Sequence, residues 1–200
     1  MALHDHTYAV IMAGGVGSRF WPMSRSGSPK QFLDILDRGR TLIQMTADRL
    51  EPTLPYDRMY VVTNVRYKDE VMAQLPDLPE DHILCEPFMR NTAPCLAYAH
   101  HRIAKNDPDA TIIVASADHL IEDEEGFRDV LDVAVQQASE TSQLLTLGIT
   151  PTRPDTGYGY IQYEELPGAH DERLQQVRTF TEKPNKDLAE QFISSGDFCW

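Results

Sequence analysis

An apolar strand that runs directly into a glycine-rich loop is the feature that most constrains the fold of this chain. Residues Tyr8–Met12 have the pattern of a short buried strand, and Gly14, Gly15 and Gly17 follow it. Glycine lets backbone N–H groups approach an anion closely, because no side chain stands in the way. Residues 8–33 contain neither Asp nor Glu, although the whole chain has a formal net charge of −13. A glycine loop free of acids in an acidic chain indicates a binding site for a polyanion.

Three cations, Arg19, Arg25 and Lys30, follow this loop and can neutralise charge that backbone amides only partly offset. The spacing excludes the Walker phosphate loop, which requires Gly-Lys-Ser/Thr at its end. It also excludes the dinucleotide fingerprint, because Phe20 stands where the third glycine belongs. The alternative is a tight turn followed by solvated cations, but the spacing of the cations favours a binding site.

The composition is that of an ordinary globular chain and excludes several classes of protein. Of the 200 residues, 42% are hydrophobic and 24% charged, which is enough for one substantial α/β domain. The negative charge argues against general binding to nucleic acid or to a membrane surface. No apolar run approaches the roughly 18 residues of a membrane span, and the N-terminus lacks the pattern of a signal peptide. Cys85, Cys95 and Cys199 are unpaired in spacing and fit a reducing compartment, so we predict a cytoplasmic protein.

Short apolar runs alternate with helical patterns along most of the chain. Five runs are predicted to be buried strands: Tyr8–Met12, Met59–Thr63, His82–Cys85, Thr111–Ala115 and Leu144–Ile149. Helices are predicted in four places: after Thr41, over Tyr67–Leu75, from Asn91 or Thr92 onward, and after the acids Glu122–Glu125. Alternating strands and helices imply a sheet covered on both faces. We therefore predict a three-layer α/β/α fold with a mixed, mainly parallel sheet.

The pattern changes in the last quarter of the chain. Residues Tyr158–Tyr163 and Gln176–Thr181 are predicted strands, and Lys186–Ile193 is a predicted helix. No repeat or linker divides the sequence, so we predict that residues 1–200 form one domain. The chain ends on Phe198-Cys199-Trp200, an apolar sequence that indicates an interrupted domain rather than a natural terminus.

The glycine-loop segment resembles the signature of the sugar-1-phosphate nucleotidyltransferase family. That signature is Gly-Gly-x-Gly-x-Arg, then a proline, then Pro-Lys, and it runs here from Gly14 to Lys30. The form Phe20-Trp-Pro-Met-Ser-Arg25, ending in Pro29-Lys-Gln-Phe32, is similar to mannose-1-phosphate guanylyltransferases. Further matches follow in order: Glu86-Pro-Phe-Met-Arg-Asn-Thr-Ala-Pro94, Ala117-Asp-His119, Thr156-Gly-Tyr-Gly-Tyr-Ile161 and Glu182-Lys-Pro184. Met89 stands where many members have glycine.

The resemblance implies a Rossmann-like nucleotidyltransferase domain over residues 1–200. It implies the reaction of mannose 1-phosphate with GTP, giving GDP-mannose and pyrophosphate, with Mg²⁺ as cofactor. The sugar phosphate would attack the α-phosphorus in line without a general base, so catalysis would consist of positioning and charge neutralisation. Two alternatives stay open: a hexose-1-phosphate nucleotidyltransferase that uses UTP or dTTP, and a non-catalytic module that binds a sugar nucleotide. We predict no nucleic-acid or membrane partner, and we allow for a homodimer.

Three residues are predicted to carry the catalysis. Arg19 is expected to grip the triphosphate, and Lys30 to act as a point charge beside the reacting phosphates. Asp118 follows a predicted strand, and its carboxylate suits Mg²⁺. The alternatives are surface salt bridges for the two cations and a helix N-cap for Asp118. The family pairs this aspartate with a second carboxylate, which would lie beyond Trp200.

The remaining predicted contacts divide between the nucleotide and the sugar phosphate. The nucleotide contacts are Gly14, Gly15, Gly17, Ser18, Glu86, Asn91 and Thr92. Glu86 is a candidate for guanine because a carboxylate can accept the N1–H and N2–H₂ donors, whereas Asn91 or Thr92 could instead cap a helix. The sugar-phosphate contacts are Gly157, Glu182 and Lys183. A hairpin turn at Gly157 and an ion pair between Glu182 and Lys183 are the alternatives.

Overall fold

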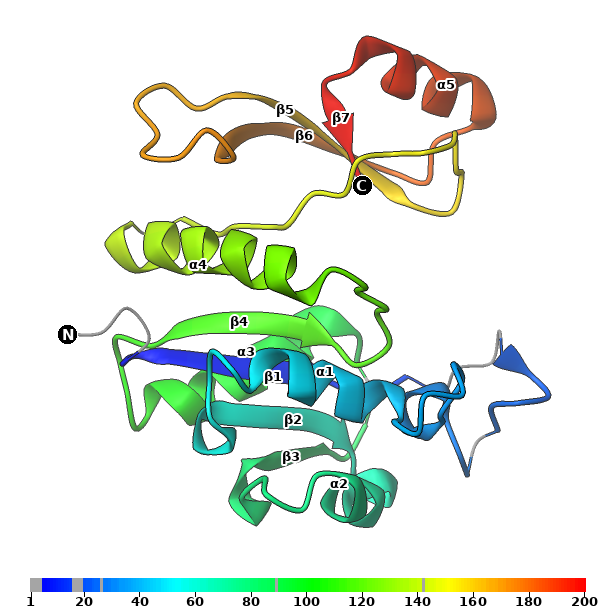
Figure 1. The fold of residues 1–200 in the computed structure, drawn as a ribbon, viewed down its shortest axis with the longest axis vertical. Coiled ribbons are helices and arrows are strands. Elements are labelled where there is room, and N and C mark those ends of the chain that lie inside the picture. Colours follow the sequence, from blue (N-terminus) through cyan, green and yellow to red (C-terminus); the bar gives the residue numbers. More distant parts are fainter. Residues whose placement is uncertain (1–4, 16–19, 26, 89, 142) are drawn as a thin grey trace. The chain divides into compact units, whose positions relative to one another are not determined.

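The computed structural model describes residues 5–15, 20–25, 27–88, 90–141 and 143–200 (Figure 1). The chain divides into two compact units, Met1–Leu131 and Asp132–Trp200. The division falls inside a helix that runs from Glu124 to Glu140, and each unit has its own sheet. Within the described residues, no helix combines the length and the apolar character that a membrane span requires.

A four-stranded sheet forms the centre of the first unit. Its strands are β1 (Thr7–Met12), β2 (Met59–Asn64), β3 (Ile83–Glu86) and β4 (Thr111–Ser116), in the spatial order β3-β2-β1-β4. All neighbouring pairs are parallel, and Met12 at the end of β1 lies opposite Val62 of β2 and Ser116 of β4. These strands are mostly apolar because a parallel sheet is covered on both faces. The parallel α/β arrangement confirms the fold class predicted from the sequence.

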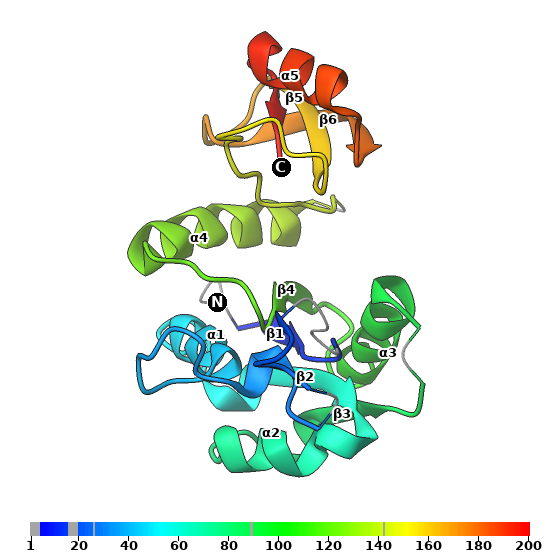
Figure 2. The ribbon, with the colours of Figure 1, turned by 90° about the vertical axis from the view of Figure 1, so that its right-hand side faces the viewer.

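Helices cover both faces of this sheet (Figure 2). On one face lie α1 (Leu42–Leu50) and α2 (Lys68–Gln74), and on the other lies α3 (Thr92–Ala104). Along α1, Ile43, Ala47 and Leu50 recur at helical spacing and are at most 1% exposed, so burial of this stripe stabilises the helix. The core under α3 joins strand and helix residues: Val10, Tyr60, Val62, Leu84, Cys95, Ala99 and Ile103.

Shorter elements connect the strands and helices of the first unit. Among the described residues, four of these are 3-10 helices: η2 (Lys30–Phe32), η3 (Tyr56–Arg58), η4 (Val65–Tyr67) and η5 (Glu80–His82). The helix that crosses the division is α4 (Glu124–Glu140). Its first turn holds Glu124 and Glu125, and the Asp123 carboxylate accepts a hydrogen bond of 2.9 Å from the Gly126 N–H. The acids predicted at this helix N-terminus are therefore confirmed, and they complement the positive end of the helix dipole.

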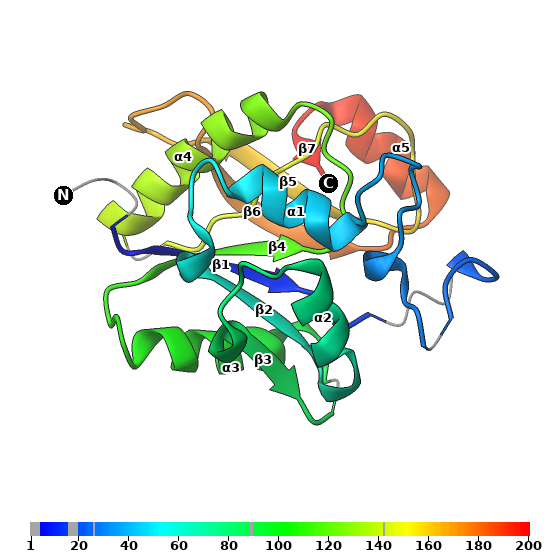
Figure 3. The ribbon, with the colours of Figure 1, turned by 60° about the horizontal axis from the view of Figure 1, so that its bottom comes forward.

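The strand order of the first unit reverses direction beside β1. The chain moves from β1 to β2 to β3 on one side, and then crosses back to place β4 on the other side of β1. Because the four strands are parallel, the loops after β1 and β4 leave the sheet at the same edge (Figure 3). Open α/β sheets bind ligands in the crevice at such a switch point. The topology therefore predicts a ligand site at residues 13–15 and 116–118.

Besides the end of the helix that crosses the division, the described part of the second unit contains an antiparallel sheet and a further helix. Its elements are β5 (Gly159–Glu165), β6 (Gln175–Glu182), α5 (Lys186–Ser195) and β7 (Phe198–Cys199), with the strands in the order β6-β5-β7. Tyr160 is fully buried in this unit and its ring contacts those of Phe192 and Trp200. The two strands and the helix predicted here are confirmed. The three strands form a sheet of their own, in which β6 and β7 pair with the two edges of β5.

The strand predicted over Leu144–Ile149 is wrong, since no part of this segment is a strand. In the described part of the chain, its backbone hydrogen bonds outside regular structure are a reciprocal pair between Ile149 and Trp200, of 2.9 and 2.8 Å. An apolar run predicts burial, but a strand also needs a neighbour that supplies a full ladder of hydrogen bonds. The sequence pattern does not reveal whether that neighbour exists.

A polar network at the opposite, amino-terminal edge of the parallel sheet gives a prediction about stability. Asp107 is 9% exposed and accepts hydrogen bonds from His6 Nδ1 at 2.8 Å and from the Tyr8 hydroxyl at 3.1 Å. Burial raises the pKa of Asp107, but the bonds from His6 and Tyr8 outweigh it, so the pKa lies below its ordinary 3.8. We expect Asp107→Asn to lower the free energy of unfolding by about 1–3 kcal/mol at neutral pH, because a buried charge-assisted network is broken.

The sign of the pH dependence follows from the lowered pKa of Asp107. A carboxylate that binds its proton less readily in the folded state stabilises the fold above its unfolded pKa, and this contribution is lost as the pH falls through the folded value. Urea unfolding of both proteins between pH 7 and pH 3 should therefore show their difference shrinking in the acid range. A difference that stays constant would contradict this account.

Candidate active site

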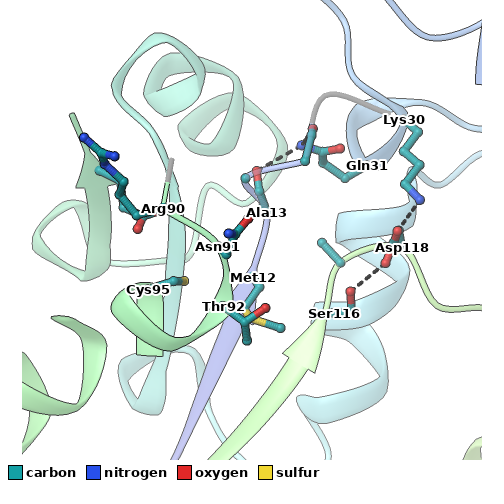
Figure 4. Close-up of a pocket in the computed structure, with 14 residues that line it drawn as sticks. Met12, Ala13, Lys30, Gln31, Arg90, Asn91, Thr92, Cys95, Ser116 and Asp118 are labelled. Atoms are coloured by element: carbon teal, nitrogen blue, oxygen red, sulfur yellow. Dashed lines mark hydrogen bonds and ion pairs between the residues drawn. The ribbon is translucent and has the colours of Figure 1, made fainter. Parts of the chain in front are cut away.

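A pocket of about 310 Å³ opens at the carboxyl edge of the parallel sheet (Figure 4). It is lined by the ends of β1, β3 and β4 with the residues that follow them, by η2 and by the start of α3: Met12, Ala13, Gly14, Gly15, Lys30, Gln31, Glu86, Arg90, Asn91, Thr92, Cys95, Ser116, Ala117 and Asp118. The pocket therefore lies at the switch point of the sheet, within the first unit. It brings together seven residues predicted as site residues: Gly14, Gly15, Lys30, Glu86, Asn91, Thr92 and Asp118.

The loop after β1 is held in place by side chains that the sequence analysis missed. Gln31 is 2% exposed, and its Nε2 donates to the carbonyl oxygens of Ala13 at 2.9 Å and Gly15 at 3.0 Å. The Thr63 hydroxyl also donates to the Ala13 carbonyl, at 2.9 Å. These bonds fix the path of the glycine loop beside the pocket. The signal in the sequence was a polar residue, Gln31, directly beside Lys30, but nothing in it identified the carbonyls that Gln31 contacts.

Gly17, Ser18 and Arg19 lie outside the described residues, so their predicted roles stay predictions from the sequence. Gly14 is described, and it lies close to the side chain of Glu86. A Cβ at Gly14 would lie 3.9 Å from Glu86 Oε2, an ordinary contact. Gly14 therefore borders the same part of the pocket as the Glu86 carboxylate.

Lys30 and Asp118 meet on the pocket wall and form an ion pair (Figure 4). Lys30 comes from η2, and the Ser116 hydroxyl at the end of β4 donates to the other carboxylate oxygen of Asp118 at 2.6 Å. Burial raises the pKa of Asp118, but the hydrogen bonds from Lys30 and Ser116 outweigh it and hold the pKa below its ordinary value. Asp118 is thus ionised at neutral pH. It does not cap the next helix, which begins only at Glu124.

The oxygen donors of this wall fit a divalent metal that is shared with phosphate groups. Asp118 supplies a carboxylate and Ser116 a hydroxyl, both hard ligands that suit Mg²⁺. Among the described residues, no three His, Cys, Asp or Glu side chains gather into a cluster that could hold an ion by themselves. Mg²⁺ in phosphate-transfer sites usually takes one or two carboxylates, substrate phosphates and water. The donor set therefore fits such a shared ion and not a closed protein cage.

The opposite wall of the pocket carries a buried carboxylate. Glu86, at the end of β3, is 9% exposed, and burial raises its pKa. Beside it, burial and the charge of Glu86 raise the pKa of the Cys95 thiol to about 11, so Cys95 stays neutral. The Glu86 carboxylate faces the pocket without an ion-pair partner among the described residues, which leaves it available to donors on a ligand.

Asn91 and Thr92 form the part of the wall where α3 begins (Figure 4). Asn91 occupies the N-cap position, but its side chain makes no capping hydrogen bond. Its φ of 67° lies in the left-handed region, which is strained for a residue other than glycine. Its amide is therefore free of the capping role that the sequence allowed, and it lines the pocket.

The predicted sugar-phosphate residues belong to the second unit. Lys183 Nζ lies 2.6 Å from Glu182 Oε1, which is the ion pair that the sequence left as an alternative. The Gly157 N–H donates to Asp155 Oδ1 at 2.8 Å, as in a tight turn. A Cβ at Gly159 would come within 2.9 Å of Glu182 Oε2, so glycine allows the Glu182 side chain to lie this close to β5. Within the unit, these residues gather where β5 begins and β6 ends.

The sequence is similar to known proteins along almost its whole length. The family model described as nucleotidyl transferase matches residues 8–200. The chain belongs to the nucleotidyl transferase family. This membership confirms the family predicted from the glycine loop and the later motifs, and it agrees with a pocket at the switch point of a parallel sheet.

Two relatives of this nucleotidyl transferase and one solved structure that is similar to it carry related names. Proteins named mannose-1-phosphate guanylyltransferase from Klebsiella pneumoniae and Escherichia coli K12 are each 40% identical, over 193 and 198 residues. The match covers 96% of this chain and 40% and 41% of those proteins, so the chain spans about two fifths of their length. A crystal structure from Thermus thermophilus, named mannose-1-phosphate geranyltransferase, is 33% identical, with a TM-score of 0.86, over 98% of this chain and 55% of that one.

Proposed function

We propose that this protein transfers GMP from GTP to mannose 1-phosphate, giving GDP-mannose and pyrophosphate. The observation that carries the proposal is the pocket that joins the glycine loop with Lys30, Asp118 and Glu86 at the switch point of the sheet. The names of relatives that are 40% identical favour this substrate pair over the alternatives with UTP or dTTP.

The proposed reaction is an in-line displacement. An oxygen of the sugar phosphate forms a bond to the α-phosphorus of GTP, the bond from that phosphorus to the oxygen bridging to the β-phosphorus breaks, and pyrophosphate leaves with this oxygen. The attacking phosphate is already a competent nucleophile, so no side chain needs to remove a proton. The barrier is the approach of two anions, which cations in fixed positions lower.

The residues of the pocket have separate roles in this proposal. The backbone of Gly14 and Gly15 approaches the phosphates, and Lys30 neutralises charge on the transferred group. Asp118 would hold Mg²⁺, and Ser116 orients its carboxylate by a hydrogen bond. When bound, Mg²⁺ supplies further positive charge to the phosphate oxygens. Arg19 is assigned to the departing pyrophosphate from its place in the sequence alone.

The second unit is assigned to the sugar phosphate. Glu182 can accept hydrogen bonds from two adjacent hydroxyls, and Lys183 can hold the phosphate once it leaves its ion pair with Glu182. Gly157 lets a backbone amide approach the sugar. In this proposal residues 1–200 act as one nucleotidyltransferase domain. The proposal allows for a homodimer. The three cysteines are unpaired, which supports the cytoplasmic location predicted from the sequence.

Pyrophosphate release from GTP and mannose 1-phosphate tests the proposal directly. We expect release only when the nucleotide, the sugar phosphate and Mg²⁺ are all present. A series with UTP, dTTP and ATP in place of GTP decides the base, and other hexose 1-phosphates decide the sugar. Binding of GDP-mannose without any pyrophosphate exchange would instead identify a non-catalytic binding module.

Glu86 gives a prediction about the choice of base. Its carboxylate can accept both the N1–H and the N2–H₂ of guanine, whereas a glutamine amide offers one acceptor and one donor. We expect Glu86→Gln to lower kcat/KM for GTP by about 10- to 100-fold, the effect of losing a hydrogen bond to a buried charged group. Inosine triphosphate lacks the N2 amine, so the variant should also discriminate less between GTP and inosine triphosphate.

A surface variant separates this effect from the loss of a charge. Glu80→Gln makes the same substitution at an exposed position paired with Lys68. It should leave kcat/KM unchanged for both GTP and inosine triphosphate. If Glu86→Gln keeps the discrimination of the unmodified protein between GTP and inosine triphosphate, Glu86 does not contact the base.

A further inference from the structure

A charged side chain of α1 is buried beneath the loop that carries Asp118. Arg49 is 2% exposed. Its Nη2 donates to the backbone carbonyl of His119 at 3.2 Å, its Nε lies 4.0 Å from Glu124 Oε1, and its guanidinium lies 5.8 Å from the centre of the Phe127 ring. The Arg49 carbonyl lies 3.5 Å from Arg128 Nη1, which donates to it. These residues all belong to the first unit.

Burial of this guanidinium is not explained by packing alone. Removing a charge from water costs free energy, and burial lowers the pKa of Arg49 while the charge of Glu124 raises it. The Nε atom is buried and has no hydrogen-bond partner in the described part of the chain. An apolar side chain of similar length would fill the same space without this cost. The arginine therefore serves something that packing does not require.

The segment that Arg49 contacts is held at one end by β1 and Lys30 and at the other by the first turn of α4. Residues 117–123 lie between β4 and α4 and belong to neither. Near Asp118, the Ala117 N–H donates to Met12 O at 3.1 Å, and Ser116 and Lys30 contact the Asp118 carboxylate. Beyond Asp118, the hydrogen bond from Arg49 to His119 O holds the backbone on the other side. It is a direct link from α1 to the residue that follows Asp118.

We propose that Arg49 is a positioning residue for Asp118: through the His119 carbonyl it fixes the backbone that directs the Asp118 carboxylate into the pocket. This inference rests on the proposed function, in which the Asp118 carboxylate is the metal ligand. Arg49 itself touches no substrate. Outer contacts of this kind typically change metal affinity or activity by about 10- to 100-fold when they are removed.

Arg49→Met tests the proposal, because methionine is apolar and of similar length. Glu124 is 40% exposed on its side chain and still lies near Arg128, so the variant leaves no deeply buried charge unpaired. We expect a melting temperature within about 4 °C of the unmodified protein. We expect kcat to fall about 10- to 100-fold, with the KM for GTP nearly unchanged, because only the alignment of Asp118 is lost. Mn²⁺ titration of the protein without substrates, followed by electron paramagnetic resonance, should show about tenfold weaker binding.

Thr46→Val is the matched control on the same helix. Thr46 is fully buried in α1, and its hydroxyl donates to Leu42 O at 2.9 Å, within its own helix. It should change the melting temperature without changing kcat or Mn²⁺ affinity. Arg49→Lys keeps the charge and a donor group for the His119 carbonyl, so its kcat and Mn²⁺ affinity should fall less than those of Arg49→Met. The lysine variant serves for the same comparison if the methionine variant does not fold.

The outcomes separate this inference from the proposed function. An unchanged kcat and Mn²⁺ affinity in a folded Arg49 variant would overturn the positioning role. If the unmodified protein releases no pyrophosphate from GTP and mannose 1-phosphate, the proposed function fails. The Mn²⁺ titration still decides the role of Arg49 in that case, because it reports on Asp118 without substrates.

Discussion

Asp118→Asn should lower the rate of pyrophosphate release by about 1000-fold, the largest effect expected of any single substitution in the pocket. Asparagine has nearly the same shape, but it carries no charge and offers a single oxygen. In the proposed reaction Asp118 holds the metal, so Mn²⁺ binding to the protein should be lost together with turnover. The fold should survive, because Asp118 lies on the open wall of the pocket and an asparagine there can still accept the hydrogen bond from Ser116. Initial rates, Mn²⁺ titration and thermal unfolding of the same preparation measure the three effects.

A neighbouring acid provides the control for this experiment. Glu122→Gln removes the same charge four residues away, at a side chain that is 79% exposed and 3.8 Å from Arg38. It should leave the rate and the Mn²⁺ affinity unchanged. Asp118 does not hold the metal if the stability lost by Asp118→Asn is large enough to explain its lower rate. The same conclusion follows if Glu122→Gln lowers the rate equally.

Lys30→Met should change two measurements in opposite directions. Turnover should fall about 100-fold, because a cation placed beside the reacting phosphates is removed. The affinity of the free protein for Mn²⁺ should rise about tenfold, because the Lys30 ammonium no longer competes for the Asp118 carboxylate. A residue that served only stability would not strengthen metal binding when it is lost. This opposite pair of changes therefore distinguishes a working ion pair from a structural one.

Lys105→Met makes the same substitution at the exposed end of α3 and should alter neither quantity. The two variants have the same net charge, so a difference between them reports position and not charge. If Lys30→Met binds Mn²⁺ no more tightly than the unmodified protein, Lys30 and the metal do not share the Asp118 carboxylate.

Much of the fold could be predicted because local patterns and long-range packing agree. The four strands of the parallel sheet are apolar runs between helical patterns, and the structure has them within one or two residues of the predicted ends. The predicted strand over Leu144–Ile149 has the same kind of apolar run, yet it lacks a ladder of hydrogen bonds. Apolar character is a property of the segment itself, whereas a ladder is a property of the segment and its neighbour.

The candidate site divides in the same way. Gly14, Lys30 and Asp118 were predicted because their chemistry suits phosphates and metal and because they fall in recognisable motifs. Gln31 and Arg49 were missed, because the atoms that they contact are backbone carbonyls, 16 to 18 residues away for Gln31 and 70 residues away for Arg49. A sequence states which side chains can donate a hydrogen bond, but it does not state which carbonyl the fold brings within reach.

By itself the sequence determined the class of the fold, the family, and the residues whose charge and chemistry suit a phosphate ligand. Only the tertiary structure decided that Lys30 and Asp118 form an ion pair, that Glu86 is buried across the pocket from them, and that Arg49 lies beneath the loop that carries Asp118. The physical reason is that charge and hydropathy are local properties of the chain. Pairing, burial and the resulting pKa shifts arise only when distant segments share the same low-dielectric space.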